Sequence, residues 1–342
     1  MRLSLLSAAS AFFTTALSHH GHFIRSDDAP QYAPVPATAI GPVIPSTGYL
    51  VQSFGGGAYV VLDGSYQSLF FVSTKGVIVV DCPPTLGHNL LYAIGNTTDI
   101  PVTHFVYSHS HGDHVGGASL FNNGKVIYIA HEDTKSRLSE TPDAKRPLPS
   151  VTFKDNKTLS VGNQTLELAY KGPNHEPGNI FIYAPKQKVL ALIDVVFPGW
   201  VPFAELAVSE DIPGWIHAHD LILEYDFVHY VGGHLSRTGV RQDVLVQKEY
   251  IQDLMDNCKE AITNSTMSIN DIVGPTVQKN PGNGWATFKT YLTYVANECS
   301  EKTNKKWLGR LGAADVFGYD NAFKMVEVLR LDYSFLGPFG VV

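Results

Sequence analysis

Residues 108–114 read S-H-S-H-G-D-H, which places three imidazoles and one carboxylate within a span of six residues. The apolar, β-rich run before them predicts a strand that delivers this H-x-H-x-D-H cluster on its trailing loop. Because side chains alternate along a strand, His109 and His111 can point the same way, with Asp113 and His114 on the turn that follows. Neutral imidazoles beside a carboxylate suit a divalent cation such as zinc. The alternative is a His-rich surface loop, but four ligand side chains at this tight spacing rarely coincide by accident.

Three further candidate ligands follow downstream, each in its own context. His175 stands in the segment G-P-N-H-E-P-G-N, Asp194 ends an apolar run, and His234 ends the run Y-V-G-G-H. With the first motif, these segments resemble the metallo-β-lactamase superfamily, whose pattern has H-x-H-x-D-H, then G-x-x-H-[ST]-P-G, a strand ending in Asp, and a strand ending in G-H. The resemblance covers about residues 48–240, and Glu176 replaces the usual hydroxyl residue.

The resemblance implies a site for two metal ions that share one bridging carboxylate. The implied ligands are His109, His111 and His175 for one metal, Asp113, His114 and His234 for the other, and Asp194 as the bridge. The expected cofactors are two Zn²⁺ ions, with iron as the alternative. Such ions, about 3.5–4 Å apart, share a water and remove its proton near neutral pH, and the bridging hydroxide then attacks a carbonyl carbon.

Two carboxylates are expected to assist that chemistry. Asp113 can orient the hydroxide and later shuttle a proton, so it is the candidate catalytic residue. Asp81 ends another predicted strand, near the site in folds of this kind, and is expected to accept an imidazole N–H from a ligand histidine. Turn capping is the alternative role for Asp81.

The residue types around the bridge bear on the substrate. True β-lactamase branches of the superfamily tend to carry Cys or Ser in place of Asp194, whereas Asp is typical of branches that resemble lactonases and glyoxalase II. The resemblance therefore places the chain closer to the latter. Phe197 stands where many quorum-signal lactonases carry Tyr, and no basic patch for glutathione is evident near the motifs. β-Lactam hydrolysis is kept as a promiscuous activity.

An aromatic, uncharged segment follows the candidate bridge directly. Residues 197–203 read F-P-G-W-V-P-F, and Trp215 comes soon after. Phe197, Trp200, Phe203 and Trp215 are therefore candidates for an apolar substrate pocket beside the metals, with ordinary loop packing as the alternative. A pocket of this kind predicts a small neutral or hydrophobic ester, lactone or amide as substrate.

Two other classes of protein compete with a secreted zinc hydrolase. One is an iron-dependent oxidoreductase, similar to the superfamily's persulfide dioxygenases or diiron oxygen reductases, although no flavodoxin-like module or rubredoxin-like cysteine set supports the diiron version. The other is a metal carrier without turnover, which the complete ligand set disfavours. The formal net charge of −7 and the lack of a long Lys/Arg block argue against nucleic acid as a partner. No membrane partner is expected, and the oligomeric state is left open.

The pattern along the 342 residues predicts an α/β (α+β) fold, the αββα sandwich of the superfamily with a C-terminal helical extension. Residues 1–18 resemble a secretory signal peptide, because Arg2 precedes an apolar, uncharged run and a small-x-small cleavage site. Residues 19–47 form an irregular lead-in, and the sandwich is expected over residues 48–238. Residues 239–342 are expected to pack on this core, with helices near 239–263, 285–299, 301–311 and 314–330.

Four glycosylation sequons and two of the cysteines are consistent with secretion of the protein. N-x-[ST] sequons stand at Asn96, Asn156, Asn163 and Asn264, and they would be glycosylated in a secreted eukaryotic protein. Cys258 and Cys299 lie on inward faces of predicted helices, where they form either one disulfide in an oxidising compartment or two separately buried thiols. Cys82 follows a buried strand and is expected to be a free thiol.

Overall fold

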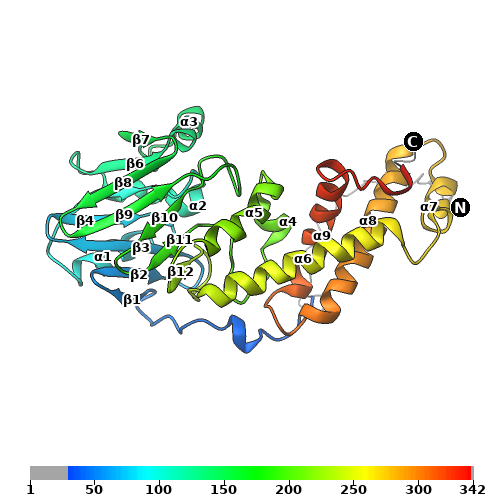
Figure 1. Ribbon diagram of the computed structural model, residues 1–342, viewed down its shortest axis with the longest axis horizontal. Helices are drawn as coiled ribbons and strands as arrows, with labels where there is room; N and C mark the ends of the chain where they lie inside the picture. Colours follow the sequence, from blue (N-terminus) through cyan, green and yellow to red (C-terminus); the bar gives the residue numbers. More distant parts are fainter. Residues whose placement is uncertain (1–29, 340–342) are drawn as a thin grey trace, which may run out of the picture. The chain divides into compact units, whose positions relative to one another are not determined.

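Two β-sheets pack face to face in the protein, which the computed structural model describes over residues 30–339 (Figure 1). The first sheet has its strands in chain order, antiparallel from β1 to β4 and parallel from β4 to β7. Its strands are β1 (Leu50–Gly55), β2 (Ala58–Leu62), β3 (Gln67–Ser73), β4 (Gly76–Val80), β5 (Val102–Val106), β6 (Ile127–His131) and β7 (Val151–Phe153). The predicted signal peptide, residues 1–18, lies outside the described residues.

The second sheet has the strand order β12-β11-β10-β9-β8. Strands β11 and β12 pair in parallel, and the other neighbours pair antiparallel. Its strands are β8 (Asn156–Val161), β9 (Gln164–Ala169), β10 (Phe181–Ala184), β11 (Val189–Ala191) and β12 (His229–Val231). Parallel strands in both sheets deliver the loops at their carboxyl ends to a common edge, where sites in folds of this kind lie.

The sheets bury a shared apolar layer because the side chains of each strand alternate between its two faces. On β3, Leu69 and Phe71 face the layer between the sheets, whereas Phe70 packs on the opposite side. Leu166 of β9 and Ile182 of β10 fill the same layer from the second sheet.

Helices cover both outer faces, which completes the predicted αββα sandwich. On the first sheet, α1 (His88–Gly95) buries Leu90, Ala93 and Ile94 at helical spacing, and α3 (Glu132–Glu140) packs against β6 and β7. The short elements α2 (Gly112–Val115) and η3 (Ala118–Phe121) contribute to the same apolar layer. On the second sheet, the covering helices are α5 (Ile212–Leu223) and α6 (Arg241–Thr263).

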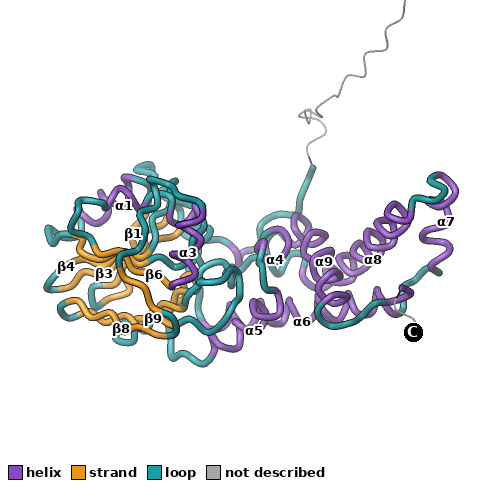
Figure 2. The backbone as a smooth tube through the Cα atoms, turned by 90° about the horizontal axis from the view of Figure 1, so that it is seen from above, coloured by secondary structure: helices purple, strands orange, loops and turns teal. Residues whose placement is uncertain are grey.

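The C-terminal extension consists of α6 and the helices α7 (Ile269–Lys279), α8 (Gly284–Trp307) and α9 (Ala314–Leu331). Helices α6, α8 and α9 lie side by side, and their buried side chains continue the apolar layer on the second sheet (Figures 1 and 2). The helices predicted at 285–299 and 301–311 are one helix, α8, because no residue between them breaks it. Helix α7 is not expected from the sequence, since it contains Pro275. Within residues 30–339, no helix is both long and apolar enough to span a membrane.

The segment α4 (Ala204–Val208) is a left-handed turn rather than a regular α-helix. The residues from Glu205 to Ala207 have φ between 56° and 63°. A non-glycine residue in this region costs roughly 1–2 kcal/mol, so the turn needs support from outside. Asn321 of α9 provides it, because its Oδ1 accepts the N–H of Leu206 and its Nδ2 donates to the carbonyl of Pro202, both at 2.8 Å.

A disulfide joins α6 to α8 in the extension. The Sγ atoms of Cys258 and Cys299 are bonded at 1.98 Å, which is the first of the two alternatives that the sequence left open. Cys82 is a buried free thiol, as expected.

Reduction of this disulfide is expected to lower the free energy of unfolding. The bridge joins residues 41 positions apart, and closing such a loop stabilises a protein by about 4 kcal/mol in the chain-entropy model. Guanidinium unfolding with and without a reductant measures the change, and the Cys258→Ala/Cys299→Ala variant is the control that a reductant should not affect. An unchanged unfolding midpoint, in wild-type protein whose mass shows full reduction, would contradict this prediction.

Candidate metal centre

The candidate ligands come from loops at one edge of the sandwich. His109 and His111 follow β5, and the next two ligands lie on α2; the remaining three follow β9, β11 and β12. The full set is His109, His111, Asp113, His114, His175, Asp194 and His234. Asp194 was expected to end a strand, but β11 ends at Ala191, and β5 ends at Val106, before His109. The ligands therefore lie on loops, and strand alternation does not set their directions.

The backbone conformation at this edge explains why Asp and Gly stand at positions 194 and 233. Asp194 has a φ of 62°, in the left-handed region that Asp adopts more readily than most residues. Gly233 has a φ of 96°, and a Cβ there would lie 2.6 Å from Cγ2 of Ile193 and 2.9 Å from Cε1 of His114. Only glycine lets the chain pass this close to a ligand imidazole while it turns toward His234.

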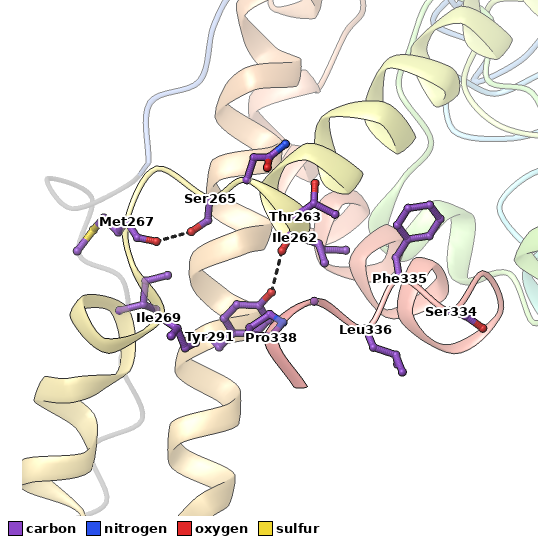
Figure 3. Close-up of a pocket in the computed structure, with 13 residues that line it drawn as sticks. Ile262, Thr263, Ser265, Met267, Ile269, Tyr291, Ser334, Phe335, Leu336 and Pro338 are labelled. Atoms are coloured by element: carbon purple, nitrogen blue, oxygen red, sulfur yellow. Dashed lines mark hydrogen bonds between the residues drawn. The ribbon is translucent and has the colours of Figure 1, made fainter. Parts of the chain in front are cut away.

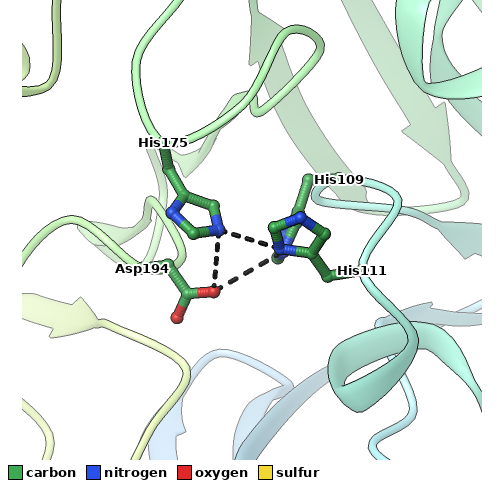
Figure 4. A group of neighbouring side chains, drawn as sticks. All are labelled: His109, His111, His175 and Asp194. Atoms are coloured by element: carbon green, nitrogen blue, oxygen red, sulfur yellow. Dashed lines mark hydrogen bonds and ion pairs between the residues drawn. The ribbon is translucent and has the colours of Figure 1, made fainter. Parts of the chain in front are cut away.

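The carboxylate of Asp194 lies at the centre of the cluster, surrounded by four imidazoles. Its Oδ2 lies 3.1 Å from Nε2 of His114, 3.3 Å from Nε2 of His175 and 3.5 Å from Nε2 of His109. Its Oδ1 lies 3.0 Å from Nε2 of His234. Figure 4 shows His109, His111 and His175 turned toward this carboxylate. Asp194 therefore stands where a residue shared by two cations would stand.

The other donor atoms divide into two groups on either side of Asp194. In one group, Nδ1 of His111 lies 2.9 Å from Nε2 of His175. In the other, Nε2 of His114 lies 3.1 Å from Nε2 of His234, and Oδ2 of Asp113 lies 3.5 Å from His114. The ligand atoms within each group lie within 4.8 Å of one another. The two groups contain the same residues as the two ligand sets that the resemblance implies.

These residues fit a divalent cation. Buried polar atoms normally have a partner, yet Nε2 of His109 and Oδ1 of Asp194 have no hydrogen-bond partner among residues 30–339. Nε2 of His114 and Nε2 of His234 also lie only 3.1 Å apart while both face the carboxylate of Asp194. Imidazole nitrogens and carboxylate oxygens that converge in this way are a donor set for zinc or iron.

The pKa values of three buried ligands favour the forms that bind metal; for the buried ligand His114, burial lowers the pKa but Asp194 raises it to about 9, so a cation there would have to displace a proton. Burial lowers the pKa of His109 well below its usual range, and it lowers the pKa of His175 to about 4, so both imidazoles are neutral. Burial would raise the pKa of Asp194, but the imidazoles of His114, His175 and His234 hold it well below its usual range. A neutral imidazole and an ionised carboxylate are the ligating forms of these side chains.

Asp81 acts on the cluster through a different contact from the expected one. Its Oδ1 accepts the backbone N–H of Ser108 at 2.8 Å, and Oγ of Ser108 lies 2.8 Å from Nδ1 of His109. Among residues 30–339, no imidazole donates to Asp81; its Oδ2 and Nδ1 of His114 are both without a hydrogen-bond partner. Burial raises the pKa of Asp81 to about 6, against the opposing effects of His114 and Ser108. The expected direct bond to a ligand histidine is therefore corrected to a contact relayed by Ser108.

Three of the four aromatic pocket candidates line a pocket at the centre, and one does not. Phe197, Trp200 and Phe203 line a cavity that also includes Asp113 and His234. Trp215 does not line it.

The assignment of Trp215 to the pocket is therefore corrected. The residue is fully buried under the ligand loop, where its Nε1 donates to the carbonyl of Asp194 at 3.0 Å. Its ring also packs edge-on against His219 at 4.9 Å between ring centres. Trp215 supports the backbone of the central carboxylate rather than a substrate.

Tyr66 is a site residue that the sequence did not point to. It lies in the turn before β3, and its hydroxyl donates to Oδ2 of Asp113 at 3.2 Å. Its ring lies 4.7 Å from that of His234. Burial and the neighbouring Asp113 raise the pKa of Tyr66 to about 12, so the phenol remains a donor. Nothing in the local sequence marks Tyr66, because only the fold brings this turn to the ligands.

The comparisons with known proteins agree with this architecture. The family model of the metallo-beta-lactamase superfamily matches residues 44–248, more than half of the chain. The chain is 27% identical over 246 residues to the 2,4-dinitroanisole O-demethylase subunit alpha of Nocardioides sp. (strain JS1661), covering 70% of this chain and 71% of that protein. It is 28% identical over 193 residues to the metallo-beta-lactamase type 2 of Elizabethkingia meningoseptica, covering 54% of this chain and 76% of that protein.

Solved structures show the same fold. The metallo-beta-lactamase from Pontibacter korlensis superposes with a TM-score of 0.52 at 23% identity, covering 60% of this chain and 99% of that one. The metallo-beta-lactamase IND-7 superposes with a TM-score of 0.50 at 20% identity, covering 59% of this chain and 98% of that one. The resemblance expected from the motifs is confirmed, and the chain belongs to the metallo-β-lactamase superfamily.

Proposed function

We propose that the protein is a hydrolase that uses two Zn²⁺ ions and acts on a small, neutral and largely apolar ester, lactone or amide. The observation that carries this proposal is an apolar pocket that opens directly onto Asp113 and His234 of the candidate metal centre. A metal centre is common to the whole superfamily, so the pocket is the feature that limits the class of substrate.

The pocket has a volume of about 360 Å³ and is walled mainly by aromatic side chains. Its lining residues are Tyr66, Asp113, Phe197, Trp200, Val201, Phe203, His234, Leu235, Ala313 and Phe317. The rings of Phe197 and Phe203 lie 5.8 Å and 5.9 Å from that of His234, so a substrate at the ligands contacts them as well. No Lys or Arg occurs among these described lining residues, so away from the metal ligands the pocket offers an anionic group no counter-charge.

Helix α9 completes the pocket from outside the segment that the family model matches. The ring of Phe317 lies 6.4 Å from that of Phe203 across the pocket. Trp200 is held in place, since its Nε1 donates to the carbonyl of Ala39 at 2.9 Å. Gly312 lies so close to this indole that a Cβ would come within 2.4 Å of it. Fixed aromatic walls of this kind favour a flat, apolar group in the substrate.

The protein's own residues can move the protons of a hydrolysis. Divalent ions at these ligands would supply Lewis-acid chemistry. The side chain of Asp113 is 45% exposed toward solvent and pocket, while the hydroxyl of Tyr66 anchors its Oδ2. From this position, Asp113 can take up a proton from an attacking water and return it to the leaving group.

The names of two relatives bear on the substrate. The Nocardioides protein is named for O-demethylation of 2,4-dinitroanisole, a neutral aromatic ether, and the Elizabethkingia protein is named a metallo-beta-lactamase. The first name supports an aromatic substrate and makes cleavage of an aryl methyl ether the second candidate function. The second name keeps β-lactam hydrolysis as a candidate side activity. A substrate of the lactonase or glyoxalase II type is supported by Asp194 alone.

A larger cavity of about 640 Å³ lies between the α6–α7 loop, α8 and the C-terminal segment (Figure 3). Within it, the hydroxyl of Tyr291 donates to the carbonyl of Ile262 at 3.4 Å. None of the residues that line this cavity carries a carboxylate, an imidazole or a thiol. We therefore place the reaction in the smaller pocket beside the metal centre.

Export of the protein is part of the proposal. The disulfide in the helical extension is typical of an oxidising compartment. All four sequon asparagines are exposed, which makes them accessible for glycosylation: Asn96, Asn156, Asn163 and Asn264. Both observations support a secreted protein.

The proposed function is tested on the full chain by metal analysis and a substrate panel. The panel contains a neutral aryl ester, an alkyl ester, a lactone, an amide, a β-lactam and an aryl methyl ether. We expect about two zinc ions per chain and the highest kcat/KM for a neutral aromatic ester, lactone or amide. Iron with oxygen consumption and no hydrolysis would overturn the proposal, and turnover of the ether alone would favour the second candidate.

Removal of metal is expected to lower the melting temperature, and return of Zn²⁺ is expected to restore it. A ligand at a thousandfold excess over its Kd stabilises the folded state by about 4 kcal/mol. Calorimetry before and after chelator dialysis measures the shift. The matched control is His217→Ala, because His217 is exposed on α5 in a second H-x-H sequence but belongs to neither ligand group. A melting temperature that does not respond to chelator would contradict the metal centre.

Replacement of Phe317 is expected to weaken substrate binding more than turnover. Phe317→Ala removes one wall of the pocket but no group near Asp194, so KM for an aromatic substrate should rise on the order of tenfold with little change in kcat. Steady-state kinetics separate the two constants. Phe323→Ala is the matched control, since Phe323 is a half-buried phenylalanine of the same helix outside the pocket. Equal kinetics for both variants would show that α9 does not contact the substrate.

A further inference from the structure

Glu176 is a buried carboxylate that directly follows the candidate ligand His175. Its side chain is fully buried, and an unpartnered carboxylate there would be costly. Two of its partners come from Ser110, whose backbone N–H donates to Oε1 at 2.5 Å and whose hydroxyl donates to Oε2 at 3.0 Å. Arg137 lies at 3.4 Å from Oε2. Glu176 is therefore held in place by hydrogen bonds and a guanidinium beside the metal centre.

The ring of His111 lies between Glu176 and the other candidate ligands. Nδ1 of His111 faces Nε2 of His175 at 2.9 Å, whereas Nε2 of His111 lies 3.3 Å from Oε2 of Glu176. An imidazole that binds a metal through one nitrogen usually donates the N–H of the other to an acceptor, which sets the tautomer and strengthens the ligand. The side chain of His111 is 36% exposed, so packing alone does not fix its ring.

We propose that Glu176 is a positioning residue of the metal centre. It accepts the Nε2–H of His111 and so leaves the lone pair of Nδ1 free to face a cation. Glu176 stands where the superfamily pattern has a hydroxyl residue, and a carboxylate there adds a negative charge behind the ligand.

The surroundings of Glu176 argue against a third cation at this place. His111, Glu176 and Glu210 bring their ligand atoms within 4.8 Å of one another. The guanidinium of Arg137 already binds Glu210 through two hydrogen bonds of 2.7 Å and 2.6 Å and approaches Glu176. Arg137 therefore supplies the positive charge that these two carboxylates need, and it also keeps Glu176 turned toward His111.

A purely structural role for Glu176 would affect folding but not metal affinity. The chain offers a matched control in Glu298, which is also buried and remote from the ligands, on α8. It accepts the backbone N–H and the hydroxyl of Thr266 at 3.2 Å and 3.3 Å and pairs with Lys302 at 3.0 Å. Glu298 thus has the same kinds of partner as Glu176, but no imidazole.

The experiment measures Zn²⁺ affinity by chelator competition for the wild-type protein, Glu176→Gln and Glu298→Gln. We expect Glu176→Gln to bind Zn²⁺ about 10–100-fold more weakly, and Glu298→Gln to bind it as the wild type does. Equal affinity for the wild type and Glu176→Gln would overturn the inference. The inference rests on the proposed metal centre, and failure of the wild type itself to bind Zn²⁺ would instead overturn that centre.

A second measurement needs no variant and covers the case in which Glu176→Gln does not fold. Long-range ¹⁵N–¹H spectra of the zinc-loaded protein, labelled at its histidines, report which ring nitrogen carries the proton. We expect the proton of His111 on Nε2, the nitrogen that faces Glu176. A proton on Nδ1 would contradict the proposed role, whatever the affinity measurements show.

Discussion

The burial of the Asp194 carboxylate among four imidazoles is the interaction on which the site depends. A lone ion of this kind would be strongly destabilised away from water, and here the neighbouring imidazoles keep the carboxylate ionised. The surrounding fold holds the carboxylate in place from several sides. Trp215 donates to the carbonyl of Asp194, and the amide of Asn179 donates to the carbonyl of Ile193 at 2.8 Å. The ends of both sheets are thereby tied to one buried charge.

This constraint explains why the candidate ligands were readable from the sequence. Donor side chains must converge within a few ångströms, so their residue types and local spacing are restricted. The motif H-x-H-x-D-H is one result of this restriction. Gly233 is a second feature of the site that shows in the sequence, because only glycine lets the backbone pass so close to His114. The αββα architecture was equally readable, since strands of a sheet with both faces covered are apolar at consecutive positions, as in β4, where all five residues are buried.

The errors share a different physical origin. The strand leading to Asp194 ends at Ala191, and the backbone of Asp194 itself is left-handed, which its residue type alone does not require. Helix α7 contains Pro275 and packs against α8, a tertiary contact that the local sequence does not show. Trp215, Tyr66 and Phe317 were misplaced or missed because tertiary contacts set their roles, and no local pattern records those contacts.

The metal centre and the pocket wall come from different parts of the chain. All candidate ligands lie between residues 109 and 234, inside the matched family region, whereas Phe317 and the Asn321 support of the left-handed turn lie beyond residue 248. The ligands are constrained by a buried charge that tolerates little change. The aromatic segment of residues 197–203 is constrained by shape and by hydrogen bonds to other parts of the chain, among them those with Ala39 and Asn321. Changes in α9 can therefore reshape the pocket without moving Asp194, which makes the extension the part of this fold where substrate preference can diverge while the chemistry stays the same.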